Sequence, residues 1–168
     1  MSAAPATLAD AAVEANAFAE QGAERELADL RAEWGEELEM TARSADYRER
    51  VVAYRAIGQF RFRQKIELIR RGLEDESPAC RGSALISLEL LSRDAPGAVN
   101  SVRSALHRLA SADDNQAVRR LAIVCLKNGP AHRDTIALLE GLADDDRQER
   151  DLAETATKVA ATLKRKSR

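Results

Sequence analysis

Residues 75–91 read DESPACRGSALISLELL, and this stretch carries the pattern that decides the fold. It opens on a turn, because Asp75 is followed three residues later by Pro78, a residue that favours the first turn of a helix. Small and apolar residues then recur every three or four positions, at Ala84, Leu88 and Leu91. Such spacing places them on one face of a helix. The stretch therefore predicts a helix that begins after Asp75 and buries one face.

The same spacing occurs four times along the chain. An arginine is followed three residues later by an alanine at Arg50/Ala53, Arg81/Ala84, Arg119/Ala122 and Arg150/Ala153. Six residues before these arginines stand residues that favour helix caps, namely Ser44, Asp75, Asp113 and Asp144. Four residues after the alanines stand Ile57, Leu88, Leu126 and Thr157. The arginines are 31, 38 and 31 residues apart, the size of a helical hairpin, so we expect a hairpin repeat.

The composition favours helix over sheet. The chain has 32 alanines and 19 leucines but only 8 valines and 6 isoleucines. Apolar stripes at helical spacing run through most of it, for example over 27–38 and 99–109, and no segment alternates as a strand would. A hydrophobic fraction of 45% excludes a disordered chain. The predicted fold class is all-α.

Each repeated residue has a role in a stack of hairpins. The alanine lets neighbouring helices approach closely, and the Leu or Ile one turn later fills the layer between repeats. The aspartate caps the inner helix. We expect Arg81, Arg119 and Arg150 to pair with the aspartate of an adjacent repeat and to fix the register, rather than to bind a ligand.

The segments Asp75-x5-Arg81 and Asp113-x5-Arg119, with Cys80 and Val118 directly before the arginines, resemble the turn and inner helix of HEAT-like repeats. The resemblance covers about residues 44–163. It implies a short α-solenoid of about four helical hairpins, whose inner helices line a concave face. An irregular helical bundle is the alternative fold. Residues 1–43 would form acidic capping helices, and residues 164–168 a basic tail.

The formal net charge of −2 conceals a separation of charge along the chain. Residues 1–42 carry ten acidic and two basic side chains, whereas residues 43–71 carry nine basic and three acidic ones. Residues 72–163 have a net charge of −4, and the tail adds +4. The sequence therefore predicts a polarised surface, acidic on the first helices and basic on the next.

Six basic residues crowd the segment 55–71, with Phe60 and Phe62 among them: Arg55, Arg61, Arg63, Lys65, Arg70 and Arg71. One interpretation is a nucleic-acid site, in which the cations contact phosphates and an aromatic ring stacks on a base. The favoured interpretation is structural, with the phenylalanines anchoring a turn in the core and the charges meeting the acidic helix of residues 20–39. A pI near 5.8 argues against strong nonspecific nucleic-acid binding.

Residue patterns that indicate catalysis are absent from the sequence. His107 and His132 lack the spacing of metal ligands, and Cys80 and Cys125 fall at inner-helix positions where we expect them to be buried and inert. No glycine-rich phosphate loop is present. We therefore predict no catalysis, cofactor or metal site. Some HEAT-like proteins are DNA glycosylases, so a DNA-base repair enzyme is a weaker alternative; Trp34 falls on an apolar stripe and is expected in the core.

The prediction for function is a non-catalytic scaffold or adaptor that binds a partner protein on its concave helical face. Besides the basic segment 55–71, the candidate contact residues on inner helices are Arg48, Arg55, Arg120, Lys127 and Lys158, which would suit an acidic or helical segment. The longest apolar run, Leu121–Leu126, is six residues, and no secretion signal is visible. We expect a cytoplasmic protein without a membrane-spanning segment.

Overall fold

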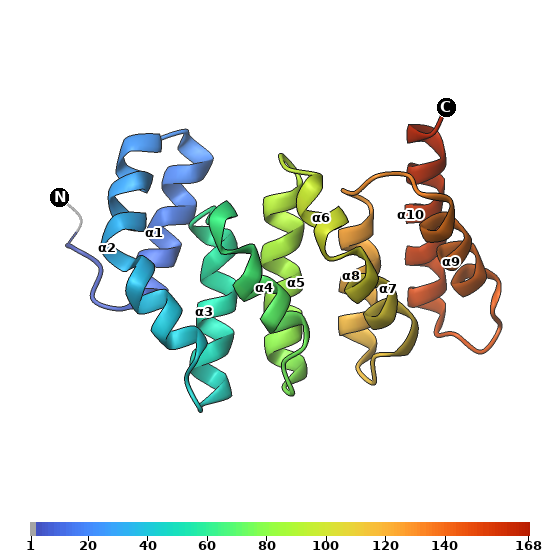
Figure 1. Ribbon diagram of the computed structural model, residues 1–168, viewed down its shortest axis with the longest axis horizontal. Coiled ribbons are helices and arrows are strands. Elements are labelled where there is room, and N and C mark those ends of the chain that lie inside the picture. Colours follow the sequence, from blue (N-terminus) through green and yellow to red (C-terminus); the bar gives the residue numbers. More distant parts are fainter. Residues whose placement is uncertain (1–2) are drawn as a thin grey trace. The chain divides into compact units, whose positions relative to one another are not determined.

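The structure is a computed structural model that describes residues 3–168 (Figure 1). Helices account for 77% of the described residues, which contain no β-strand. The prediction of an all-α protein is confirmed. Within the same range, no helix combines the length and the apolar character needed to cross a membrane.

The chain divides into two compact units, one that ends at Leu91 and one that spans Ser92–Arg168. The sequence up to Leu91 carries 17 acidic and 12 basic side chains, and the remainder carries 11 acidic and 14 basic ones. The first unit therefore has a formal charge of −5 and the second a charge of +3. The two folded units differ in the sign of their charge.

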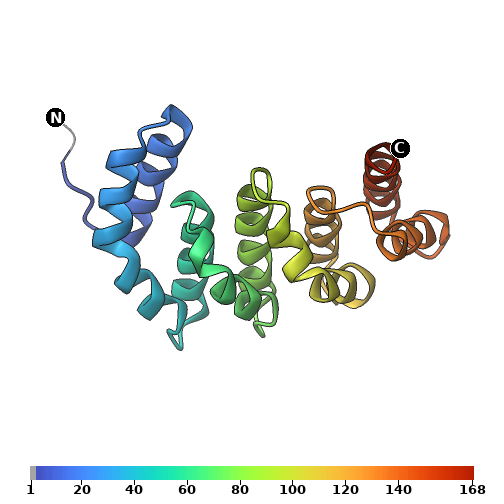
Figure 2. The same ribbon diagram turned by 45° about the horizontal axis from the view of Figure 1, so that its top comes forward.

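The first unit is built on a hairpin of two helices with a third packed against both. Its segments are α1 (Leu8–Gln21), α2 (Glu24–Ala42), α3 (Tyr47–Gln59), η1 (Arg63–Lys65), α4 (Ile66–Leu73) and all but the last residue of α5 (Pro78–Ser92). Helices α1 and α2 lie side by side, and α3 contacts both (Figures 1 and 2). Gly22 allows the turn between α1 and α2, because its φ of 70° is in the left-handed region that favours glycine.

The core of the first unit follows the predicted apolar stripes. Leu27, Trp34 and Leu38 of α2 are buried, as the three- and four-residue spacing indicates. Tyr54 and Ile57 of α3 are fully buried as well. The hydrophobic face of each helix therefore holds the hairpin and α3 together.

Close packing joins α3 to α5 within this unit. The buried Ser87 hydroxyl of α5 donates to the carbonyl oxygen of Tyr54 at 2.5 Å and accepts a hydrogen bond from the amide of Gly58 at 2.9 Å. A Cβ atom on Gly58 would lie only 2.7 Å from the Cα of Ser87. Position 58 must be glycine at this helix spacing.

The second unit contains two helical hairpins. Its helices, apart from the end of α5, are α6 (Gly97–Ser101), α7 (Arg103–Ala112), α8 (Gln116–Leu126), α9 (Arg133–Asp144) and α10 (Arg150–Lys166). Helix α7 packs on α8, and α9 packs on α10 (Figures 1 and 2). In addition α8 lies beside α10 and α7 contacts α9, so that corresponding helices of the two hairpins adjoin.

The residues expected to cap the repeated helices form turns instead. The oxygens of Ser44, Asp75 and Asp113 each accept a hydrogen bond from the backbone amide two residues further on, before the helix starts. In two of these repeats the cap is a later residue, Asp46 for α3 and Asn115 for α8. Such turns shape the entry of the chain into the helix, so the predicted position was right but the predicted capping role was wrong.

Two of the four repeated arginines bind their own turns. Arg50 donates to the carbonyl oxygens of Ser44 and Ala45, and Arg81 donates to those of Asp75 and Glu76. These acceptors lie six and five residues before each arginine. The interval of six residues in the sequence pattern therefore reflects a hydrogen bond from the arginine side chain to the turn before its own helix.

The predicted arginine–aspartate ladder is present in part. Arg50 pairs with Asp75 of the following turn. Arg119 instead donates to the carbonyl oxygen of Ala110, and Arg150 pairs with Glu154 on its own helix. The expectation was wrong at these two arginines, because neither forms an ion pair with an aspartate of an adjacent repeat. In the fourth repeat Asp145, rather than Asp144, accepts the turn hydrogen bond, from the amide of Arg147.

Candidate functional site

The aromatic residues of the basic segment lie inside the protein. Phe60 is fully buried and Phe62 is 7% exposed, and the two rings stack with their centroids 5.3 Å apart. Arg31 of α2 donates to the carbonyl oxygens of Phe60 and Arg61 and so fixes the turn that carries them. The expectation that the phenylalanines anchor a turn in the core is confirmed, and neither ring is available to stack on a nucleic-acid base.

Several cations of this segment bind groups of the first unit. Lys65 forms an ion pair with Glu39 of α2 at 2.6 Å, and its Nζ lies 5.0 Å from the centre of the Phe62 ring. The hydrogen bond from Lys65 lowers the pKa of the Glu39 carboxyl. Arg61 donates to the side-chain oxygen of Asn16 and to the carbonyl oxygen of Gly58. The predicted meeting of this segment with the acidic helix therefore takes place, through Lys65 and Glu39.

The remaining basic residues of the segment differ in exposure. Arg70 pairs with Glu67 on α4 at 3.3 Å. Arg55 is partly buried on α3, its Nη1 has no hydrogen-bond partner among the described residues, and burial lowers its pKa. Arg63 is exposed on η1, and Arg71 is exposed at the end of α4. Only Arg71 of this group lines the cleft described next.

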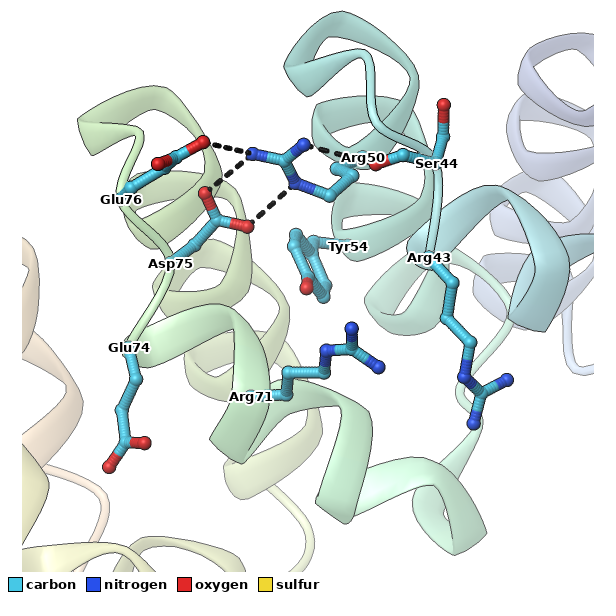
Figure 3. A pocket seen from close by; sticks show the side chains of 8 residues that line it. All are labelled: Arg43, Ser44, Arg50, Tyr54, Arg71, Glu74, Asp75 and Glu76. Atoms are coloured by element: carbon cyan, nitrogen blue, oxygen red, sulfur yellow. Dashed lines mark hydrogen bonds and ion pairs between the residues drawn. The ribbon is translucent and has the colours of Figure 1, made fainter.

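A cleft of about 440 Å³ opens in the first unit between the start of α3, the end of α4 and the turn that follows it (Figure 3). Three guanidinium groups line it, from Arg43, Arg50 and Arg71. Three carboxylates also line it, from Glu74, Asp75 and Glu76, together with Ser44 and Tyr54. The distribution of partners among these charges determines what the cleft can bind.

One of the three arginines is neutralised inside the cleft. Arg50 donates through Nε and Nη2 to the two carboxylate oxygens of Asp75, at 2.8 and 3.0 Å, and Glu76 lies 3.8 Å from the same guanidinium. The hydrogen bonds that Arg50 donates to Asp75 raise the pKa of Arg50. Burial opposes ionisation of Asp75, but the hydrogen bonds from Arg50 and from the amide of Ser77 outweigh it and lower the pKa of Asp75. This pair is structural.

The other two arginines retain unused donors. The guanidinium of Arg71 forms no hydrogen bond or ion pair with any residue of the described chain. Arg43 has a side chain that is 55% exposed, and its closest carboxylate is that of Glu39, at 4.0 Å. Both cations are therefore able to bind an anion from solution.

Tyr54 provides a polar group without a partner beside these cations. The residue is fully buried, and its hydroxyl has no hydrogen-bond partner among the described residues. In Figure 3 the hydroxyl end of the ring points toward the guanidinium of Arg71. Gly72 makes room for the ring, since a Cβ there would lie 3.0 Å from the ring carbon Cδ1. Burial raises the pKa of Tyr54, so the hydroxyl is a hydrogen-bond donor at neutral pH.

In the second unit, the predicted contact residues Arg120, Lys127 and Lys158 lie on the adjoining helices α8 and α10. Arg120 pairs with Asp151 of α10 at 3.4 Å, and Lys166 of α10 donates to the carbonyl oxygen of Lys127 at 2.6 Å. Residues later in α8 thus meet residues later in α10, so the two helices run in the same direction. We call the surface formed by Arg120, Lys127 and Lys158 the α8–α10 face.

Two lysines of the α8–α10 face lack internal partners. Lys127 follows Arg120 by seven residues, and Lys158 follows Asp151 by seven residues, so both lie about two turns beyond the ion pair. Neither ammonium group forms a hydrogen bond or an ion pair with the described residues. Lys127 directly follows the end of α8, and Lys158 lies on α10 one turn after Glu154, with which it interacts electrostatically. The face therefore carries two positive charges that no hydrogen bond or ion pair within the described residues engages.

The other predicted contact residues, Arg48 and Arg55, belong to the first unit. Arg48 begins α3, its side chain is 76% exposed, and it binds its own neighbour Asp46 at 3.0 Å. Arg55 lies two turns further along α3 and is partly buried. Arg43 and Tyr54 are not predicted by the sequence to line a cleft, because Tyr54 falls on an apolar stripe that indicates only a core position.

The cysteines and His107 are buried or hydrogen-bonded within the protein. Cys80 and Cys125 are buried, as expected from their inner-helix positions. The Nε2 atom of His107 lies 2.8 Å from the buried hydroxyl of Thr135, and burial lowers the histidine pKa. In the described part of the chain, no three His, Cys, Asp or Glu side chains gather as ligands of a metal ion.

In comparisons with known proteins, no family model matches the chain, and no curated protein matches it at a significant level.

Proposed function

We propose that this protein is a non-catalytic interaction module, built as a short solenoid of HEAT-like hairpins, that binds an acidic segment of a partner protein. The observation that carries the proposal is the α8–α10 face, where Lys127 and Lys158 have no internal partner and stand on neighbouring parallel helices. Unpaired cations on adjacent helices attract and orient an acidic helix.

The charge of the second unit supports an acidic partner. Its formal charge is +3, although many of its carboxylates stand in the turns, at residues 113–114 and 144–146. None of these turn carboxylates belongs to the α8–α10 face. Asp151, which lies beside this face, forms an ion pair with Arg120. An acidic segment that lies across α8 and α10 would therefore meet Lys127 and Lys158 directly.

The solenoid in this proposal is supported by two regularities. Corresponding helices adjoin in the two hairpins of the second unit, α7 with α9 and α8 with α10. In the first unit, Arg50 and Arg81 each bind the carbonyl oxygens of their own turn with the same spacing. Stacked hairpins with a repeated turn are the usual unit of such arrays.

A protein partner is favoured over nucleic acid because the aromatic rings of the basic segment 55–71 are buried and one of its cations is already paired. Phe60 and Phe62 are buried, and Lys65 is held by Glu39. Stacking on bases needs exposed rings, and phosphate binding needs cations that are not already paired. A nucleic-acid-associated factor would therefore find no exposed ring in this segment to stack on a base, although Arg71 remains without an internal partner.

A defined peptide tests the proposal. The probe is a fluorescein-labelled amphipathic helix with glutamates along its polar face, titrated with the protein and followed by fluorescence anisotropy. The double variant K127E/K158E should weaken binding about tenfold or more, because two attractions become repulsions. The matched control R133E/R168E changes the net charge equally at exposed positions outside the face and should change affinity less than about twofold. Equal losses in both variants would mean that only net charge matters and would refute the site.

A further inference from the structure

The strongest unused feature of the molecule is the hydroxyl of Tyr54. Buried hydroxyls are nearly always hydrogen-bonded, because an unsatisfied one loses its interactions with water without replacement. Tyr54 is 0% exposed, and its hydroxyl has no partner among the described residues. A phenylalanine would fill the same space without this loss. The packing of the core therefore does not explain why residue 54 is a tyrosine rather than a phenylalanine.

The cationic side chains around the Tyr54 hydroxyl suggest what it binds. The Arg71 guanidinium, toward which it points, has no internal partner, and Arg43 lines the same cleft with most of its donors unused (Figure 3). The carboxylates of the cleft are directed elsewhere: Asp75 and Glu76 bind Arg50, and the Glu74 side chain points away from Tyr54 (Figure 3). On this side of the cleft only donors converge.

We propose that Arg43, Tyr54 and Arg71 form a binding site for a phosphoryl group. A phosphoryl group presents several oxygen acceptors in a tetrahedral arrangement and is bound by arginine with good geometry. Both arginine side chains turn toward the anion and uncover the Tyr54 hydroxyl, which is covered in this structure. One oxygen of the anion then accepts from the hydroxyl, and the two guanidinium groups bind the others. The Arg50–Asp75 pair forms the wall of the site and does not change.

This site is independent of the proposed partner surface. It lies in the first unit, whereas the α8–α10 face belongs to the second. A phosphorylated side chain and a free phosphate present the same chemistry to Arg43, Tyr54 and Arg71, so both sources are tested with separate probes.

The experiment measures anion binding to the full chain by following arginine side-chain NMR resonances. Inorganic phosphate, phosphoserine and acetate are titrated separately at constant ionic strength maintained with chloride. Phosphate and phosphoserine should saturate the Arg71 resonance, and acetate should bind about tenfold more weakly because it offers fewer acceptors. Tighter binding of phosphoserine would identify the source as a phosphorylated residue, and tighter binding of phosphate would identify a free anion; both results support the site.

The decisive variant is Y54F, because it removes only the hydroxyl. It should melt at or above the temperature of the unaltered protein, since the hydroxyl has no internal partner, yet bind phosphate about tenfold more weakly. R71A should weaken binding at least as much. The controls are Y47F at the half-exposed tyrosine and R25A at an exposed arginine of α2, and both should leave binding unchanged. Normal phosphate affinity in Y54F, or acetate binding as strong as phosphate binding, would overturn the proposal.

Discussion

The guanidinium of Arg50 and the carboxylate of Asp75, 25 residues apart in the chain, form two hydrogen bonds of 2.8 and 3.0 Å. Their side chains are only 11% and 7% exposed. The same arginine binds the turn that precedes α3, and the same carboxylate accepts the amide of Ser77 in the turn that precedes α5. One buried ion pair therefore links two successive turns of the first unit.

Removal of one partner from this pair should be costly. We expect D75A to lower the free energy of unfolding by about 3 kcal/mol, because it leaves the buried charge of Arg50 with only the exposed Glu76, 3.8 Å away, as a counterion. The double variant R50L/D75A should lose less than the sum of the two single losses. Urea denaturation measures all three. The control D151A removes an exposed ion pair and should cost no more than about 0.5 kcal/mol; similar losses at both aspartates would contradict the account.

The pKa of Asp75 makes this stability depend on pH. A carboxyl whose folded pKa lies below its unfolded value stabilises the fold above the unfolded pKa, about 3.9, and this contribution disappears as pH falls toward the folded pKa. Unfolding free energy should therefore fall below about pH 4. In D75N, compared by thermal melts between pH 2 and 7, that fall should be smaller. An unchanged acid profile in D75N would show that Asp75 is not responsible.

Two glycines should respond in opposite directions to substitution by alanine. G58A should destabilise the protein by about 2 kcal/mol or more, because the new Cβ meets the backbone of Ser87 at 2.7 Å. G141A lies inside α9 with nothing within 4 Å of the new atom, and should stabilise by about 0.5–1 kcal/mol. Differential scanning calorimetry compares the two. A neutral G58A would show that α3 and α5 are not held as closely as described.

The Lys65–Glu39 pair predicts a rescue by charge exchange. K65E should destabilise the first unit, because it places two carboxylates together beside the buried Phe62 ring. The exchanged double variant E39K/K65E should recover part of the loss, about 1 kcal/mol, as measured in urea. No recovery would mean that Lys65 acts through its contact with Phe62 rather than through Glu39.

The helices and their buried faces follow directly from spacing, as Leu27, Trp34 and Leu38 illustrate. The roles of polar residues were harder to predict, because they depend on which groups the fold brings together. The interval from Ser44 to Arg50 is visible in the sequence, but only the fold shows that the arginine binds the turn itself. The sequence could not predict that the Tyr54 hydroxyl lacks a hydrogen-bond partner, because a tyrosine and a phenylalanine fit the same position of an apolar helix face.

The most direct test of the central claim is an amide NMR titration with the acidic amphipathic peptide. The account predicts that the resonances that shift belong to α8 and α10, with the largest changes around Lys127 and Lys158, and that the shifts weaken as salt is added. Changes confined to the first unit, or spread evenly over every exposed cation, would contradict it.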